Sequence, residues 1–128
     1  MQSPSQAQLL RIFIGEADRH GGRPLYEAIV IKAREMHVAG ATVLRGGMGY
    51  GHSSRLHTTK MLRLSADLPL VIEIVDSPRK IAAFLPVLDA MMSEGQGSGL
   101  LTVENVQVLQ YGRHPLGAAV ERRPQASH

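Results

Sequence analysis

The sequence predicts a single α+β domain in which a four-stranded antiparallel sheet carries two helices on one face. Three observations support this prediction. Four short apolar runs have the alternation or the density that is typical of β-strands. Two longer segments between them repeat apolar residues every three or four positions, as amphipathic helices do. The 128 residues suit one domain, and the segments follow in the order strand, helix, strand, strand, helix, strand.

The first strand and the first helix are predicted in the N-terminal third of the chain. Residues 1–8 are polar and are expected to form a disordered lead-in, and the alternating residues 9–15 are expected to form a strand. A polar turn over 16–22 leads to Pro24, which suits the first position of a helix because its missing N–H is no loss there. Gly40 is a natural stop for this helix. Its apolar face is formed by Leu25, Ala28, Ile29, Ala33 and Met36.

The middle of the chain is predicted to hold two strands that are separated by a long loop. The first, 41–45, runs into a glycine-rich segment that continues to about residue 66. The second, 68–76, has apolar residues on both faces, and only Glu73 interrupts them. A strand of this kind is covered on both sides. Because two helices cover only one face of the sheet, we expect another copy of the chain to cover the other.

The second helix is predicted to begin at Asp76 or Ser77, either of which can cap it, with Pro78 in the first turn. Pro86 lies inside the apolar stripe of this helix. An interior proline removes one helical hydrogen bond, so we expect a kink or a short break at this position.

The last third of the chain completes the predicted topology. A second glycine-rich loop over 93–99 precedes the fourth strand over 100–111, so the domain is expected to span 9–112 and a flexible tail to span 113–128. This order of elements is the split βαβ, or ferredoxin-like, arrangement. The two glycine-rich loops come from distant parts of the chain, and they can meet across a boundary between two copies.

The composition excludes several classes of function. The chain has no cysteine, which excludes disulfides, cysteine-ligated zinc and thiol catalysis. No apolar run approaches the ~18 residues that span a bilayer, and no signal-peptide pattern is present, so we expect a cytoplasmic protein. The net charge of +3 comes without a basic run and with 4% aromatic residues, which argues against a nucleic-acid partner. No paired acids or nucleophile motif stand near the glycine-rich loops, so we expect no enzyme activity.

Segment 45–60 has the chemistry of an anion-binding loop. Glycine lets a ligand approach the backbone closely, and peptide N–H groups beside cationic side chains suit an anion such as phosphate. The same segment is compatible with a mobile surface loop whose charges are solvated, and with a twisted β-bulge or the base of a hairpin. Its glycines are Gly46, Gly47, Gly49 and Gly51, and its polar residues include His52, Arg55, His57 and Lys60.

Several separate motifs then occur in a defined order along residues 9 to 112. They are PLYEA at 24–28, GATV at 40–43, RGGMGYG at 45–51, His57, LPLVIEIVD at 68–76, FLP at 84–86 and TVENV at 102–106. With these motifs the sequence resembles a PII-like family of domains of unknown function, whose members are distant relatives of the PII signalling proteins.

The resemblance implies a homotrimer of ferredoxin-like subunits that binds an adenine nucleotide, such as AMP or ADP, in clefts between subunits. Each cleft would take 45–51 from one chain, and the loop at 95–102 would complete it. The long loop over about 50–67 would be the partner-binding element that ligand orders or releases, and a membrane transporter is one partner that the resemblance implies. No cofactor is implied beyond the nucleotide, which would act as a regulatory ligand.

The resemblance also assigns roles to individual positions. The implied nucleotide-binding residues are Arg45, Gly46, Gly47, Gly49, Gly51, Gly97, Gly99, Thr102 and Arg113, and the implied partner-binding residues are Tyr50, His52, Arg55, His57 and Lys60. The chain departs from PII proteins in three places. Leu100 follows the second glycine loop where PII proteins have a lysine, and the last strand offers Gln107, Gln110 and, just beyond it, Arg113 in place of phosphate-binding arginines. The long loop also lacks the tyrosine-centred modification motif of many PII proteins. We therefore expect a nucleotide with fewer phosphates than ATP.

Three of these assignments leave an alternative open. Arg45 can contact a phosphate or pair with Glu73 on an adjacent strand. The glycines at 95, 97 and 99 can form a nest of N–H groups, or they can end a helix and form a flexible turn. Arg113 can reach a neighbouring cleft or belong to a disordered tail.

The histidines and the fold allow two further hypotheses. His52 and His57 are either solvated or bind a divalent metal, as in a cation-tolerance-type trimer, and a metal would need a third ligand from another element or chain. A small ferredoxin-like enzyme or RNA binder is the remaining alternative, and the scarcity of aromatic residues and of acid–base pairs weighs against it.

Overall fold

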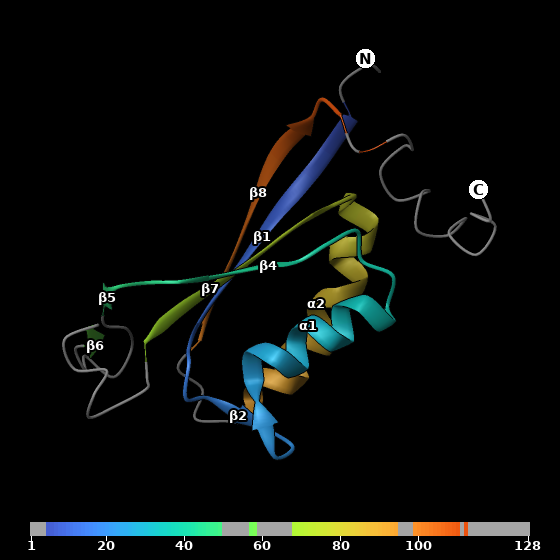
Figure 1. Cartoon of the computed structure of the whole chain (residues 1–128). Coiled ribbons are helices and arrows are strands. Elements are labelled where there is room, and N and C mark those ends of the chain that lie inside the picture. Colours follow the sequence, from blue (N-terminus) through green and yellow to red (C-terminus); the bar gives the residue numbers. More distant parts are fainter. Residues whose placement is uncertain (1–4, 50–56, 59–67, 95–98, 111, 113–128) are drawn as a thin grey trace.

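The computed structural model describes residues 5–49, 57–58, 68–94, 99–110 and 112, and its architecture confirms the predicted fold. Four strands form one antiparallel sheet in the order β4-β7-β1-β8. Helices α1 and α2 lie together on one face of that sheet (Figure 1). The bounds are β1 Ser5–Gly15, α1 Leu25–Glu35, β4 Thr42–Arg45, β7 Pro69–Asp76, α2 Pro78–Ser93 and β8 Leu100–Val108.

Two short hairpins are added to this frame. Strands β2 (Arg19–His20) and β3 (Arg23–Pro24) pair within and just beyond the segment that was predicted as a polar turn. Gly21 and Gly22 connect them with φ angles of +59° and +84°, which a two-residue hairpin turn of this hand requires. Strands β5 (Met48–Gly49) and β6 (His57–Thr58) form the second hairpin, which lies beyond the end of β4.

The hydrophobic core fills the space between the sheet and the two helices. The buried residues of the central strands alternate along each strand, and the helices contribute buried residues at three- and four-residue steps. The apolar face of the sheet therefore packs against the apolar faces of the helices. The core residues are Leu10, Ile12 and Ile14 of β1, Leu70, Ile72 and Ile74 of β7, Leu25, Ala28, Ile29 and Ala33 of α1, and Ile81, Phe84, Leu88 and Met91 of α2.

Strand β1 begins at Ser5, four residues before the predicted start, so the expected disordered lead-in over 1–8 was too long. The polar sequence of 5–8 gives no strand signal of its own. These residues are extended because β8 continues beside them, with Ser5 opposite Val108 and Gln8 opposite Asn105. Long-range pairing therefore overrides local composition at this end of the sheet.

Helix α1 differs from its predicted bounds at both ends. Pro24 is the N-cap residue and not the first helical residue, and the helix ends at Glu35, well before Gly40. The stop is made by His37, whose φ of +61° is left-handed. The N–H of Val38 donates to Ala33 O at 3.0 Å and that of His37 donates to Arg34 O at 3.1 Å. This pair of bonds is a Schellman motif, which satisfies two carbonyls at the helix end.

Helix α2 begins as predicted, because Ser77 Oγ accepts a hydrogen bond from Lys80 N at 3.3 Å. The helix is continuous through Pro86, so the short break that we considered is absent. Both Pro86 and Ala82, whose carbonyl loses its donor to the proline, are exposed, so water can satisfy that carbonyl.

The face of the sheet that points away from the helices, here called the open face, is only partly covered in one chain. Residues that are directly opposite on antiparallel strands share a face, which assigns to the open face Leu9, Arg11, Phe13, Leu44, Val71, Glu73, Val75, Leu100, Thr102 and Glu104. In β7 the residues on this face are half-buried and alternate with fully buried ones. The predicted cover over this face is therefore absent from the single chain, and its supply by a second copy stays a prediction.

Candidate functional site

The register of the sheet brings the two predicted ligand-binding elements to the same end of the molecule. Arg45 of β4 lies opposite Leu70 of β7, and Leu70 lies opposite Ile14 of β1. On the other side of β1, Phe13 lies opposite Leu100, so Gly99 comes beside Ile14. Arg45 and Gly99 therefore stand in one row across the sheet but at its two opposite edges. At a strand spacing of roughly 4.8 Å, three spacings separate them by about 14 Å.

Backbone hydrogen bonds hold the β4 end of this row in place. Gly46 N donates to Pro69 O at 2.7 Å, and Glu16 N donates to Leu68 O at 2.8 Å. These bonds extend the β4–β7 and β1–β7 pairings by one residue each. The ends of three strands are thus tied together at Leu68 and Pro69, and the side chains of Arg45 and Glu16 start from a fixed backbone.

Gly46 and Gly49 pack over the ring of Pro69. A Cβ placed on Gly46 would lie 3.0 Å from Pro69 Cγ, and one on Gly49 would lie 3.3 Å from the same atom. Neither glycine has a left-handed φ. A side chain at either position would need Pro69 to shift by a few tenths of an ångström, so the close approach to Pro69 favours glycine there independently of any ligand.

The glycine-rich segment forms the stem of a hairpin, as the structural alternative in the sequence analysis predicted. Met48 pairs with Thr58, and Gly49 pairs with His57. The stem brings Gly49 and His57 side by side. The predicted residues Tyr50, Gly51, His52, Arg55 and Lys60 lie outside the described residues, as do Gly97 and Arg113.

Arg45 makes an ion pair with Glu16, the residue that follows β1, through Nη2 and Oε2. The alternative pairing of Arg45 with Glu73 is therefore wrong. Arg45 shares its face with Leu70, whereas Glu73 lies on the open face, where Arg11 holds it. The side chain of Glu16 is only 18% exposed, and that of Arg45 is 53% exposed.

The open face carries a second group of charges. Arg11 Nε donates to Glu73 Oε2 at 3.0 Å, and Arg11 Nη1 donates to Glu104 Oε1 at 2.6 Å. The hydrogen bond that Arg11 donates to Glu73, followed by the one that it donates to Glu104, raises the pKa of Arg11, because both carboxylates favour the charged guanidinium. Thr102 lies on the same face, directly opposite Arg11. It is exposed and stands two positions beyond Leu100, away from the row that holds Gly99.

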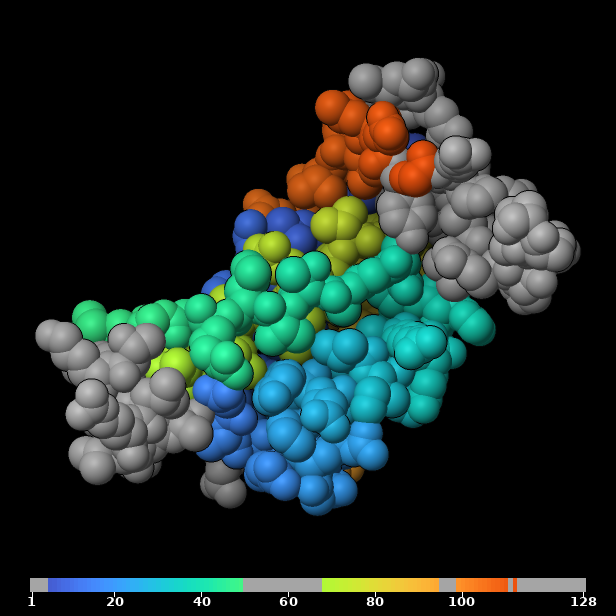
Figure 2. All heavy atoms as spheres, viewed as in Figure 1, coloured from blue at the N-terminus to red at the C-terminus, as the bar shows by residue number. Residues whose placement is uncertain are grey.

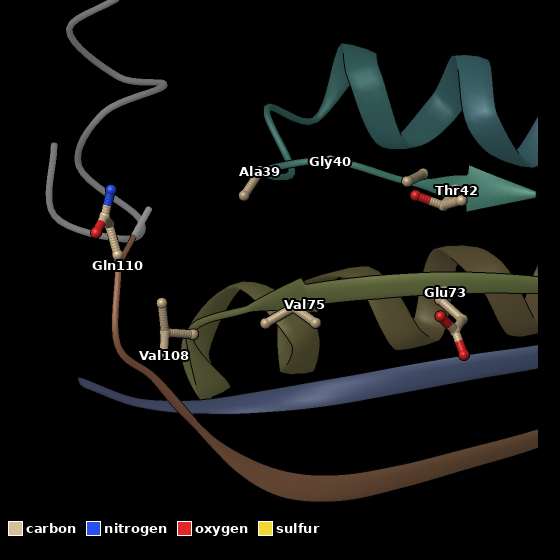
Figure 3. A pocket seen from close by; sticks show the side chains of 8 residues that line it. Ala39, Gly40, Thr42, Glu73, Val75, Val108 and Gln110 are labelled. Atoms are coloured by element: carbon tan, nitrogen blue, oxygen red, sulfur yellow. The ribbon is translucent and has the colours of Figure 1, made fainter. Parts of the chain in front are cut away.

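A cavity of about 380 Å³ lies at the other end of the sheet and contains none of the predicted site residues (Figure 3). It is lined by the segment that enters β4, by Glu73 and Val75 of β7, by Val108 at the end of β8, and by Gln110 just beyond that strand. Among the described residues that line it, Glu73 is the ionisable one, and its charge is paired with Arg11. These described lining residues therefore offer no positive group for an anion.

The described residues give no support to a metal site. Among 5–49, 57–58, 68–94, 99–110 and 112, no group of three histidine, cysteine, aspartate or glutamate side chains could hold a metal ion. In the same part of the chain, the helices are too short or too polar to cross a membrane.

The sequence analysis did not single out Glu16 or Pro69. Glu16 lay within a stretch interpreted only as a polar turn, and a lone acidic residue in a turn carries no signal of its partner. The partner comes from a strand 29 positions further along the chain. Pro69 lay at the start of a predicted strand, and its role depends on the two glycines that fold over it.

The order and the register of the strands define a ferredoxin-like α+β fold. Among solved structures, the chain is similar to CPII, a nitrogen regulatory PII-like protein from Thiomonas intermedia K12 that was solved with ADP, AMP and bicarbonate. The TM-score is 0.67 at 16% identity, with 84% of this chain and 92% of that chain covered. A likeness at this level of identity establishes the fold.

The chain belongs to the DUF190 family, described as "Uncharacterized ACR", whose profile matches residues 7–108. Two relatives support the assignment. A UPF0166 protein of Aquifex aeolicus is 37% identical over 102 residues, which cover 80% of this chain and 92% of the relative. A UPF0166 protein of Methanocaldococcus jannaschii is 31% identical over 103 residues, with the same two coverages. The resemblance to a PII-like family of domains of unknown function is thereby confirmed.

Proposed function

We propose that this protein is a non-enzymatic regulator of the PII-like class, which binds an adenine nucleotide such as AMP or ADP between the subunits of a homotrimer. The observation that carries the proposal is the position of the two predicted ligand-binding elements. They occupy the same row of the sheet at opposite edges. Within one subunit two central strands separate the elements, whereas the β4 edge of one subunit and the β8 edge of the next can lie against the same ligand.

The exposure of the two edges supports an assembly of this kind. Large apolar residues are exposed at the β4 edge, at Leu44 and Met48, and at the β8 edge, at Leu100 and Val103. All four residues of β4 are exposed, and this strand lies along the surface in the space-filling view (Figure 2). An edge strand that is not covered is a site for pairing with another chain. Cover over both edges would remove these apolar residues from water.

Three observations support an adenine nucleotide with few phosphates. Leu100 directly follows Gly99, so the start of β8 has no cation at that position. Arg45 is the charged member of the predicted site in the described residues, and Glu16 already offsets its charge. The structural neighbour CPII was solved with ADP and AMP. A ligand with one or two phosphates matches this modest positive charge better than ATP does.

The proposed mechanism of regulation follows from the stem formed by β5 and β6. Ligand contacts at Arg45 and Gly46 lie at the base of this hairpin, where the chain leaves the sheet. A ligand that binds better to one arrangement of segment 50–67 shifts the population towards that arrangement. The segment then presents a different surface to a protein partner, for which a membrane transporter is a candidate, and the protein acts in the cytoplasm.

Two measurements test the proposal together. Sedimentation velocity is expected to give a trimer, and calorimetry is expected to give heats of binding for AMP and ADP that exceed those for ATP. The variant Arg45→Gln is expected to weaken AMP binding about tenfold or more, because a hydrogen bond to a charged group contributes about 1.5–3 kcal/mol.

The control for this variant is Arg34→Gln, which removes the same charge from an exposed position on α1. It should leave AMP binding unchanged. Monomers at all working concentrations, or no heat with any adenine nucleotide at millimolar concentration, would overturn the proposed function.

A further inference from the structure

The pair formed by Arg45 and Glu16 has a consequence for the choice of ligand. Its two members differ in exposure, since the Glu16 side chain is 18% exposed and the Arg45 side chain is 53% exposed. Arg45 faces solvent at the edge of the sheet and can still direct free N–H groups at a ligand, because a guanidinium has five donors. Glu16 lies behind it. Any anion that binds Arg45 must therefore come close to a largely buried carboxylate.

The backbone that carries Glu16 is held in place, so the largely buried carboxylate starts from a fixed position beside Arg45. The N–H of Glu16 donates to Leu68 O at 2.8 Å. The turn that contains it is closed by two bonds, from Gly15 N to Asp18 Oδ2 at 3.0 Å and from Asp18 N to Gly15 O at 3.2 Å. A third bond, from Leu25 N to Asp18 O at 2.7 Å, ties the turn to the start of α1. Glu16 is thus a fixed negative charge beside the one described cation of the proposed site.

We infer that Glu16 is a specificity-determining residue that selects against highly charged ligands and so favours a nucleoside mono- or diphosphate over a triphosphate. The inference rests on the proposed function and names the class of ligand for the same site. Each further phosphate adds negative charge near a carboxylate in a partly buried place, where charges interact more strongly than in water. The penalty therefore grows with the number of phosphates, and a purely structural role of Glu16 gives no such dependence.

The variant Glu16→Gln isolates the charge of this residue. Oε2 of Glu16 accepts the bond from Arg45, and a glutamine carbonyl can accept the same bond. Oε1 is buried and makes no hydrogen bond within the part of the chain that the structure describes, so replacing it with an amide nitrogen breaks no described contact. Glu16→Asp is the complementary variant, because it keeps the charge and changes the reach.

The experiment measures the affinities of AMP, ADP and ATP for the full-length wild type and for three variants by calorimetry. In Glu16→Gln the ratio of ATP affinity to AMP affinity is expected to rise about tenfold, and the rise should shrink at high salt because the effect is electrostatic. Glu16→Asp should keep the wild-type ratio. The matched control is Glu35→Gln, which removes the same charge from an exposed pair with Lys32 on α1 and should change no affinity.

Equal weakening of all three nucleotides in Glu16→Gln, or no change in any, would overturn the inference, since Glu16 would then only position Arg45 or have no role. A second probe separates this result from a failure of the proposed function. Inorganic tripolyphosphate carries the charge without the nucleoside. It is expected to raise the melting temperature of Glu16→Gln by more than that of wild type or Glu35→Gln. An equal shift in all three proteins refutes the selection by charge, even if no nucleotide binds at all.

Discussion

The two edges of the sheet differ in how firmly their parts of the proposed site are built. At the β4 edge, the strand end is bonded to Pro69, the side chain of Arg45 is paired with Glu16, and two glycines pack over a proline ring. At the β8 edge, Gly99 is exposed and the strand that follows has its outer side unpaired within the described residues. One half of the site is fixed by its own subunit, and the other half depends on what lies beside it.

This difference indicates how a ligand could act on the proposed trimer. The β4 edge supplies a defined charge and a defined hairpin stem. The β8 edge supplies an apolar surface and a glycine, whose positions in an assembly are set by the neighbouring subunit. The affinity of a ligand that binds between the two edges would therefore depend on the neighbouring subunit at the β8 edge and on segment 50–67 at the β4 edge. Substitutions at three positions test whether the two edges differ in this way.

The largest effect is expected at the β8 edge. Leu100 is 56% exposed and lies beside Gly99. In one chain, the change Leu100→Asp should alter stability by no more than about 0.5 kcal/mol, as surface substitutions usually do. In the trimer it would bury a carboxylate in an apolar interface, which costs several kcal/mol. We expect at least a hundredfold weaker assembly by sedimentation equilibrium, together with loss of nucleotide binding.

The control for this prediction is Ile31→Asp. Ile31 is an apolar residue of α1 that is 37% exposed and lies on neither edge of the sheet. It should leave the sedimentation unchanged. If Leu100→Asp assembles as well as the wild type, the β8 edge does not lie at an interface between subunits.

The strands, the helices and their order in the sheet could be predicted from the sequence, because they follow from the periodicity of apolar residues and from the order of the segments. Strand and helix periods are local properties, and the ferredoxin-like order then places 45 and 99 at the same end of the sheet. The start of β1 and the stop of α1 could not be predicted in the same way. Ser5 is extended because β8 lies beside it. His37 adopts a left-handed φ and ends α1, although Gly40 was the predicted stop.

The partners of charged residues were the least predictable part of the site. The sequence alone allows Arg45 to pair with any of several carboxylates. Which one it pairs with depends on the face of β4 that its side chain occupies. A shift of one residue in the register would have placed it with Glu73 on the open face. The observed register places it with Leu70, on the side where Glu16 leaves the end of β1. Side-chain pairing thus follows from strand register, which one-dimensional patterns define only within a residue or two.

A smaller effect, on stability, is expected at the β4 edge for Gly46→Ala. The new Cβ would lie 3.0 Å from Pro69 Cγ and 3.4 Å from Pro69 O, and neither a proline ring nor a strand backbone moves easily. We expect a loss of about 1–3 kcal/mol in the free energy of unfolding, as for other overpacked sites. Denaturant titration measures it.

Gly40→Ala is the matched control, because no atom of the described part of the chain lies within 4 Å of the position of its Cβ and its φ is not left-handed. This change should be neutral or slightly stabilising, since it restricts the unfolded chain. Equal losses for the two variants would mean that the packing over Pro69 does not fix the β4 edge.

The smallest effect on stability is expected for Gly99→Ala at the β8 edge. Its Cβ would collide with the terminal methyl group of Met92 but would lie 3.4 Å from Phe13 O, an ordinary distance. Methionine has three rotatable bonds and can move its methyl group aside. We expect a cost of about 0.5–1 kcal/mol, the order of a strained rotamer. The Cβ added at position 99 would also obstruct the approach of a ligand to the backbone, so AMP affinity should fall by a larger factor than it does in Gly40→Ala.

If denaturant titration instead gives Gly99→Ala the same loss as Gly46→Ala, the two edges are equally rigid and the proposed division between them fails.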